Sequence, residues 1–146
     1  MRDKKKKSEY DKGYIARPGM RQKKYAQQSA IYNTPQGRRR VILAGIKRRC
    51  KEKGIAFDLD KEWMELHWNE GKCEVTNIVY NLMPPSRQVT GNYAMSVDRI
   101  DPNKGYTKDN CRLVCWMFNA AKGVGTDEDI RVLVEGLCRT DFLTKK

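Results

Sequence analysis

The chain has few apolar residues and no long apolar segment. Its 146 residues have a mean hydropathy of −0.81, and 33% of them are charged. No run is long enough to cross a bilayer. The basic residues near the start are followed by polar residues, where a secretory signal would have an apolar core. We therefore expect a soluble, cytoplasmic protein with one modest domain and no membrane partner.

Cysteine and histidine are too sparse for a closely spaced metal motif. The cysteines are Cys50, Cys73, Cys111, Cys115 and Cys138, and the single histidine is His67. Structural zinc sites use pairs such as Cys-x-x-Cys, and this chain has no such pair. An odd count without a secretion signal indicates reduced thiols. We expect buried free thiols in place of a structural zinc site, although Cys73 could still meet Cys111 or Cys115 in the fold.

Positive charge, by contrast, is abundant and lies mainly in the first third of the chain. The formal net charge is +12. Residues 1–25 hold ten Lys or Arg against three acids, and residues 36–53 hold eight against one. Basic side chains that neutralise phosphates give salt-sensitive binding without sequence preference. The distribution predicts DNA or RNA as the partner, and the alternative is a solvated basic tail with no partner.

The N-terminal half predicts an arm followed by helices. Residues 1–35 lack hydrophobic periodicity, so we expect an extended or disordered basic arm before a single domain at 36–146. Between residues 37 and 53, apolar residues such as Ile42 and Ile46 recur at helical spacing, and Gly54 ends the pattern. A second helix, capped by Asp58 or Asp60, follows.

Residues 126–139 carry the clearest helical pattern. Thr126-Asp127-Glu128-Asp129 is a capping-box-like start, with acids at the positive end of the helix dipole. The apolar residues that follow at helical spacing are Ile130, Leu133, Val134 and Leu137. We expect a closing helix that covers the centre of the domain.

The segment between these helices, residues 94–123, predicts two strands and a helix. A short strand at 94–101 stops before Pro102, and residues 102–105 have the composition of a turn. Residues 111–114 form a second apolar run, and residues 116–122 predict a helix that ends at Gly123. The expected order is strand, loop, strand, helix.

Five short motifs occur along residues 73–119. They are Cys73-Glu74-Val75-Thr76, Ser96-Val97-Asp98-Arg99-Ile100-Asp101, Gly105-Tyr106-Thr107, Asn110 with Val114-Cys115, and Asn119. In this order they resemble the phage-type HNH endonucleases of the ββα-metal, or His-Me finger, superfamily. The resemblance implies an α+β fold with a small ββα-metal finger at 94–123, flanked by helices. It also implies hydrolysis of DNA phosphodiester bonds with one Mg²⁺ or Mn²⁺ ion, in the host cytoplasm if a phage encodes the protein.

The resemblance also implies roles for individual residues. Asp98 and Asn119 correspond to the metal ligands, and Asn110 to the residue that fixes the finger loop. Arg99 departs from the family, because the commonest motif has histidine there. Arginine stays protonated near neutral pH, so it cannot be the general base, but it can clamp a phosphate. The base is then Asp101 or a metal-bound water, with His67, on another helix, as a distant alternative.

Contacts to the nucleic-acid backbone are assigned to basic residues of the 37–53 helix and of the finger. They are Arg38, Arg39, Arg40, Lys47, Arg48, Arg49, Lys104 and Lys122.

The same residues have plainer explanations. Asp98 and Asp101 are of a type common at hairpin ends, and Asn119 would face solvent on an ordinary helix. The missing histidine at Arg99 favours a non-catalytic nucleic-acid-binding protein on a degenerate finger, whereas the retained Asp98 and Asn119 favour the enzyme. A third alternative is a structural or inhibitory protein whose basic arm binds another protein.

Overall fold

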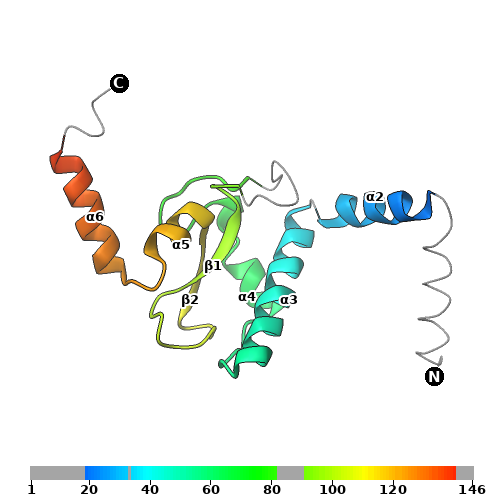
Figure 1. Cartoon of the computed structure of the whole chain (residues 1–146), viewed down its shortest axis with the longest axis horizontal. Helices are drawn as coiled ribbons and strands as arrows, with labels where there is room; N and C mark the ends of the chain where they lie inside the picture. The colour runs from blue at the N-terminus through cyan, green and yellow to red at the C-terminus, as the bar shows by residue number, and fades with distance from the viewer. Residues whose placement is uncertain (1–18, 33, 82–90, 141–146) are drawn as a thin grey trace.

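The computed structural model describes residues 19–32, 34–81 and 91–140. Its elements are α2 (Met20–Tyr32), α3 (Pro35–Lys53), α4 (Lys61–Leu66), the 3₁₀ turn η1 (Asn69–Gly71), β1 (Met95–Arg99), β2 (Cys111–Cys115), α5 (Trp116–Lys122) and α6 (Asp127–Arg139). Helices combined with one two-stranded antiparallel sheet confirm the α+β class. The sheet lies at the centre, and α2 and α6 project from opposite ends (Figure 1). No helix in these described ranges is long and apolar enough to cross a membrane.

Helix α2 lies where the sequence predicts an extended or disordered arm, and for residues 20–32 that prediction is wrong. The segment lacks an apolar stripe, but it is free of glycine and proline and rich in Ala, Gln, Lys and Arg. These residue types favour a helical backbone whether or not they form a periodic pattern. Helix α2 also contacts α3. Residues 1–18 of the predicted arm lie outside the described residues.

Helix α3 begins and ends at strong local signals. The Thr34 hydroxyl accepts a hydrogen bond from the Gly37 N–H at 3.0 Å, and Pro35 starts the first turn. Gly54 ends the helix, as the sequence predicts, with a φ of 65° in the left-handed region. Ile46 and Cys50 are buried in the core, so this face of α3 packs towards β1.

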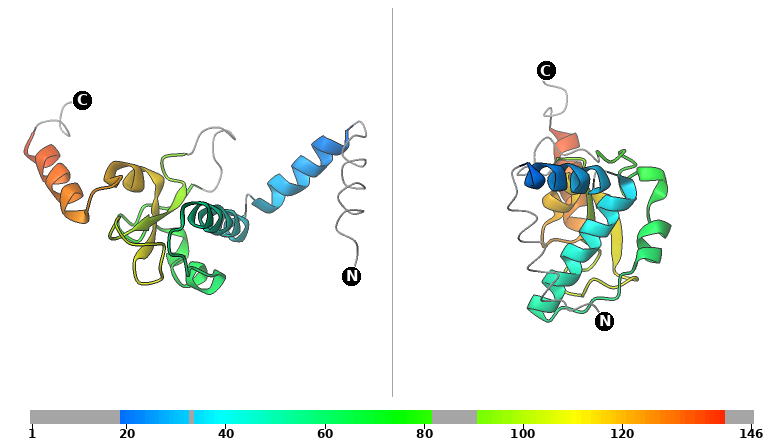
Figure 2. Two further views of the ribbon diagram at one scale, coloured as in Figure 1. Left: turned by 60° about the horizontal axis from the view of Figure 1, so that its bottom comes forward. Right: turned by 90° about the vertical axis from the view of Figure 1, so that its right-hand side faces the viewer.

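The two strands form the centre of the finger. The antiparallel register pairs Met95 with Cys115, and Val97 with Leu113. Neighbouring residues on a strand face opposite sides, yet both Leu113 and Val114 are completely buried. The sheet is therefore covered on both faces, by α3 on one side and α5 on the other (Figure 2).

The long hairpin loop is pinned by the segment that precedes α4. Tyr106 forms a bridge with Phe57, in which the Tyr106 N–H donates to the Ala56 carbonyl at 2.9 Å and the Asp58 N–H donates to the Tyr106 carbonyl at 3.2 Å. The Trp63 indole N–H donates to the Lys108 carbonyl at 3.2 Å. The loop is thus tied to residues some fifty positions earlier in the chain, which local sequence patterns do not reveal.

Helix α4 begins at Asp60 and not at Asp58. The Asp60 carboxylate accepts a hydrogen bond from the Trp63 N–H at 2.7 Å, whereas the Asp58 carboxylate accepts one from the Lys108 N–H at 2.8 Å. Of the two capping candidates, one caps the helix and the other holds the finger loop.

The outer edge of β2 is covered by Glu74. The Glu74 N–H donates to the Leu113 carbonyl at 3.0 Å, and the Leu113 N–H donates to the Glu74 carboxylate. The cysteines are all free; Cys138 is exposed and the other four are buried. Burial raises the pKa of the Cys111 thiol to about 12, which keeps it protonated and unreactive near neutral pH.

Helix α6 forms in the predicted range, and its capping box is present. The Thr126 hydroxyl accepts from the Asp129 N–H, and the Asp129 carboxylate accepts from the Thr126 N–H at 2.7 Å. The helix does not cover the domain, however, because none of its residues is buried and it extends away from the sheet (Figure 1). An apolar stripe predicts that something packs on a helix, but not which surface does so.

Gly105 provides a test of the loop closure. A Cβ atom at Gly105 would lie 2.5 Å from the Ala56 carbonyl oxygen. Because the Ala56 carbonyl belongs to the backbone and cannot rotate away as a side chain could, we expect Gly105→Ala to lower the free energy of unfolding by about 1–3 kcal/mol in urea denaturation.

The control is Gly45→Ala in α3, where the added Cβ would meet only the Arg49 side chain at 3.6 Å. It should be neutral or stabilising by up to about 1 kcal/mol, because alanine favours a helix over glycine. Equal losses in the two variants would contradict the close approach at Gly105.

Candidate active site

Asp98 is a buried carboxylate near the end of β1, with 3% of its surface exposed. The strand register places it directly opposite Arg112 on β2. Arg112 donates to Asp98 Oδ2 from Nε at 3.0 Å and from Nη2 at 2.8 Å. A carboxylate removed from water needs both hydrogen bonds and opposite charge, and Arg112 supplies both.

Lys122, in the last turn of α5, also binds Asp98. Its ammonium lies 3.1 Å from Oδ1 and 3.2 Å from Oδ2, and it donates to the carbonyls of Arg99 at 2.6 Å and Ile100 at 3.1 Å. Only 1% of the Lys122 side chain is exposed. Its assignment to the DNA backbone is therefore wrong for this conformation, because the charge is used inside the fold, where α5 meets the end of β1.

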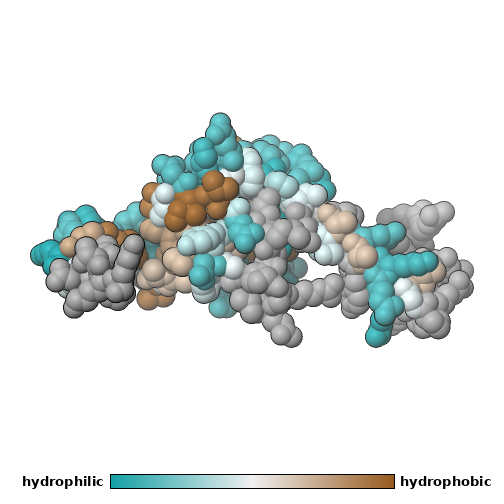
Figure 3. All heavy atoms as spheres, turned by 90° about the horizontal axis from the view of Figure 1, so that it is seen from above, coloured by the Kyte–Doolittle hydropathy of each residue, from teal (hydrophilic) through white to brown (hydrophobic). Residues whose placement is uncertain are grey.

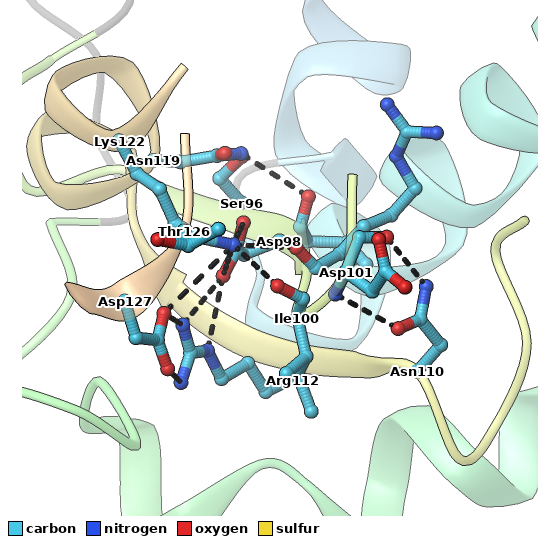
Figure 4. Close-up of polar contacts among 12 residues, drawn as sticks. Ser96, Asp98, Ile100, Asp101, Asn110, Arg112, Asn119, Lys122, Thr126 and Asp127 are labelled. Atoms are coloured by element: carbon cyan, nitrogen blue, oxygen red, sulfur yellow. Dashed lines mark hydrogen bonds and ion pairs between the residues drawn. The ribbon is translucent and has the colours of Figure 1, made fainter. Parts of the chain in front are cut away.

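Arg112 extends the cluster to α6. It donates to both carboxylate oxygens of Asp127, from Nη1 at 2.8 Å and also from Nη2. This contact holds the pKa of Asp127 below its usual value. Asp98, Arg112, Lys122 and Asp127, which we call the Asp98 cluster, join two strands and the ends of two helices (Figure 4).

Asn119 contacts β1 at a different point. Its side-chain N–H groups donate to the Ser96 hydroxyl at 2.8 Å and to the Val97 carbonyl at 3.1 Å. Figure 4 shows the Asn119 amide directed towards Ser96, whereas Lys122 and Arg112 converge on Asp98. Asn119 therefore fixes α5 on the strand, and it is not a solvent-facing residue.

The Asp98 cluster, as arranged, does not suit a divalent metal ion. Carboxylate and amide oxygens are donors that Mg²⁺ accepts, but both Asp98 oxygens already accept bonds from Lys122 or Arg112. An ion at Asp98 would lie beside two fixed positive charges. In the part of the chain that the structure describes, no group of three or more His, Cys, Asp or Glu side chains is placed to hold a metal.

Asn110 closes the finger loop. It is 4% exposed, and its side-chain N–H groups donate to the carbonyls of Asp101 and Gly105, each at 3.0 Å. Its side-chain oxygen accepts from the Asp101 N–H at 2.9 Å. Three hydrogen bonds from one amide hold both ends of the turn, which is the geometry that a loop-fixing residue needs.

Arg99 and Asp101 lie at the mouth of this loop and remain partly exposed. Arg99 donates to the Lys104 carbonyl at 2.9 Å, and its guanidinium lies 5.2 Å from the centre of the Tyr106 ring. Asp101 accepts from the Asn103 N–H at 2.9 Å and lies 3.8 Å from the Lys104 ammonium. Asp101 thus shapes the turn, as its plainer explanation predicts, and it also presents a carboxylate to solvent.

His67 belongs to another part of the fold. It stacks on Trp63 with ring centres 4.3 Å apart, and its Nδ1 lies 3.1 Å from the Glu74 carboxylate. Both partners lie outside the Asp98 cluster. These contacts describe a structural histidine at the junction of α4 and the edge of β2.

Most of the basic residues assigned to nucleic acid lie at the surface. Arg40, Lys47, Arg48, Arg49 and Lys104 are exposed, and Arg38 is partly exposed. Besides Lys122, Arg39 is an exception and corrects its assignment: it is buried, pairs with Glu65 at 2.7 Å, and lies 4.5 Å from the centre of the Trp68 ring. Within the run Arg38-Arg39-Arg40, the turn of the helix directs the middle residue into the core.

Sequence reasoning missed Arg112 and Asp127 as parts of the site. The signal was available for Arg112, because the antiparallel register of the hairpin places a basic residue opposite Asp98. Asp127 was expected only to interact with the positive end of the helix dipole, and this role needs no side-chain partner.

The fold is similar to that of a known nuclease. The described structure matches the solved structure of the rare-cutting HNH restriction endonuclease PacI with a TM-score of 0.53 and 20% sequence identity, over 68% of this chain and 75% of that chain. No protein-family model and no curated protein sequence matches the chain. At this identity the likeness concerns the fold, and it supports the HNH-type fold that the motifs imply.

The role of Lys122 can be tested by removing its charge at similar length. Lys122→Met leaves a buried carboxylate with one fewer cation and leaves two carbonyls without their donor. We expect a loss of about 3–5 kcal/mol in the free energy of unfolding, measured by denaturant titration followed by circular dichroism. Lys104→Met, at an exposed lysine, should change it by no more than about 0.5 kcal/mol. If both variants were equally stable, Lys122 would not be the link between α5 and β1.

Proposed function

We propose that the protein is an HNH-like endonuclease that hydrolyses DNA phosphodiester bonds. The finger is the observation that carries this proposal: Asp98 near the end of β1, Asn110 closing the loop, and Asn119 holding α5 on β1. These residues occur in the order of the family motif, in a fold similar to that of an HNH restriction endonuclease. That enzyme, PacI, perturbs DNA, and DNA is for this reason the substrate proposed here.

The basic surface of α3 supports the choice of nucleic acid. Exposed Arg40, Lys47, Arg48 and Arg49 lie on the solvent side of a helix whose other side packs towards β1. Helix α3 contacts β1, and Arg99 is the last residue of that strand. A phosphate backbone along α3 would lead to the loop at Arg99.

Each finger residue has a proposed role. Arg99 uses one N–H group on the Lys104 carbonyl, and its remaining N–H groups can bind the scissile phosphate. Asn110 keeps the loop in shape, and the partly exposed Asp101 is the proposed base that activates water. Asp98 and Asn119 are the proposed ligands of Mg²⁺ or Mn²⁺. Lys122 and Arg112 would first have to release the Asp98 carboxylate.

One observation favours a second candidate, a nucleic-acid-binding protein without catalysis. The Asp98 carboxylate is satisfied by internal cations, and arginine occupies the position where the commonest motif has histidine. A finger in this state holds α3 and the loop in place without needing a metal. Nucleic-acid affinity that is unchanged by EDTA, together with no cleavage, is the outcome that this candidate expects.

Cleavage is tested by incubating supercoiled plasmid with the protein in Mg²⁺, Mn²⁺ or EDTA. We expect nicking in one or both metals and none in EDTA. Asp98→Asn, which keeps the size of the side chain but removes its charge, should reduce the nicking rate by about 100-fold. His67→Gln should retain nicking, because His67 contacts Trp63 and Glu74 and not the finger loop.

The folded state of each variant is checked by its thermal midpoint, because Asp98 also supports the fold. Asp98→Ala serves as a second variant, because an alanine side chain cannot accept a hydrogen bond. Plasmid binding without nicking in every metal would establish the non-catalytic candidate in place of the nuclease. If His67→Gln lost nicking at an unchanged thermal midpoint, the general base would be His67 and the proposed role of Asp101 would be wrong.

DNA binding by α3 is tested separately from cleavage. Replacing both Lys47 and Arg48 with alanine should weaken binding equally for unrelated duplex sequences. It should make the negative slope of log affinity against log salt shallower by roughly 2. The matched control removes Lys61 and Lys72, which carry the same charge elsewhere on the molecule. If the control weakened binding as much, net charge alone and not the α3 surface would explain the affinity.

A further inference from the structure

Very few charged side chains of the described residues are enclosed by the fold. Hydrophilic residues are spread over the face of the molecule drawn in Figure 3, and the buried charged residues in the described ranges are Arg39, Asp98 and Lys122. Arg39 pairs with a carboxylate that is itself partly exposed. Lys122 and Asp98, by contrast, enclose each other, with 1% and 3% of their side chains exposed. Their contact is therefore a charge pair held away from water.

Four oxygen atoms lie within hydrogen-bond distance of the Lys122 ammonium. The two carboxylate oxygens of Asp98 lie 3.1 and 3.2 Å from Nζ, and the carbonyl oxygens of Arg99 and Ile100 lie at 2.6 and 3.1 Å (Figure 4). The Asp127 carboxylate lies further out, at 3.9 Å. An ammonium has three N–H donors, so it holds these four oxygens as a compact charge and not by one directed bond each.

The same oxygen atoms are of the kind that hard metal ions bind. Ca²⁺ takes carboxylates through one or both oxygens together with backbone carbonyls and water, in a flexible geometry, whereas Mg²⁺ requires a near-ideal octahedron. A carboxylate beside two successive carbonyls therefore suits Ca²⁺ once the ammonium is gone. The end of β1 thus forms an oxygen site for a cation, and the cation that it holds belongs to the chain.

We propose that the Lys122 ammonium is a built-in cation that excludes divalent metal ions from Asp98 in the free protein. This inference rests on the proposed function only in taking Asp98 as the position of the metal. A divalent ion at the Asp98 carboxylate would lie beside the ammonium, and like charges at such a separation repel strongly away from water. The affinity of the finger for metal is therefore set by Lys122.

Arg112 does not fill this site in the same way. Both of its hydrogen bonds to Asp98 end on Oδ2, and its guanidinium also binds Asp127. The Asp98 Oδ1 atom and the two carbonyl oxygens accept from Lys122. Removing the ammonium makes these three oxygens available together, whereas removing Arg112 would leave the ammonium in place. Lys122 is for this reason the residue to change.

Lys122→Met tests the proposal, because methionine is one atom shorter than lysine and leaves the position of the ammonium empty. Ca²⁺ binding is measured by isothermal titration calorimetry on the full chain without DNA. We expect Lys122→Met to bind Ca²⁺ at least about 10-fold more tightly than the wild type does. An ion that binds only the folded state stabilises it. Ca²⁺ at about 10 mM should therefore raise the thermal midpoint of the variant and not that of the wild type, at equal ionic strength.

Three further variants separate the site from other causes. Lys104→Met removes the same charge from an exposed lysine 3.8 Å from the Asp101 carboxylate, and it should bind Ca²⁺ as the wild type does. Asp98→Asn combined with Lys122→Met should lose the gain, because asparagine carries no negative charge. Lys122→Gln also removes the charge but keeps an N–H donor, so it guards against unfolding of the methionine variant and should show the same gain.

Several results would overturn the proposal. They are equal Ca²⁺ affinity in the wild type and in both Lys122 variants, a gain that persists with Asp98→Asn, or the same gain in Lys104→Met. Ca²⁺ that stabilises the wild type but not Asp98→Asn would show that the ion enters despite Lys122, and this measurement needs no Lys122 variant to fold. Because no DNA is present, these results are independent of nicking. Failure to nick plasmid would contradict the nuclease alone, and unchanged Ca²⁺ affinity would contradict the role of Lys122 alone.

Discussion

The buried ammonium of Lys122 is the contact on which the rest of the finger depends. It joins the last turn of α5 to the Asp98 carboxylate and to two carbonyls at the end of β1. Arg112 completes the charge balance from the opposite strand and carries the connection to Asp127 at the start of α6. A buried charge is costly without partners, so the positions of both strands and both helices are coupled. The cluster is therefore a structural element whether or not the finger cuts DNA.

A second, neutral set of contacts fixes the hairpin loop. Asn110 ties the two ends of the turn with three hydrogen bonds, and the backbone at Ala56 and Asp58 holds Tyr106 from outside. Arg99 lies at one end of the loop, and its guanidinium is oriented by the Lys104 carbonyl and the Tyr106 ring that the loop presents to it. Loop and cluster together hold the finger through contacts between protein groups.

The packing around the finger also determines which sides of α3 and α6 face outward. The basic side of α3 lies outward because Ile46 and Cys50 face the core, and the same packing takes Arg39 inward against Glu65 and Trp68. At the other end, α6 is anchored through its first residue, so its apolar side remains outside the domain core. The basic helix α3 and the apolar helix α6 thus lie on different parts of the molecule (Figure 1).

The sequence by itself determined the local structure. Gly54 and Gly123 mark helix ends, Thr126 with Asp129 starts α6, and the strand, loop, strand, helix order of the finger follows from the pattern of residues 94–123. Such features depend on neighbours within a few residues, and for that reason they can be read from the chain. The loop-fixing role of Asn110, by contrast, came from the family resemblance and not from the local pattern.

Only the tertiary structure decided which charges are internal. Arg39, Lys122 and Arg112 look like other surface cations in the sequence. Each is buried or paired because a carboxylate from a distant segment lies within reach. The helical state of α2 and the uncovered face of α6 likewise depend on what packs nearby. Long charged side chains have both an apolar stem and a charged end, so their place is set by partners that only the assembled fold brings together.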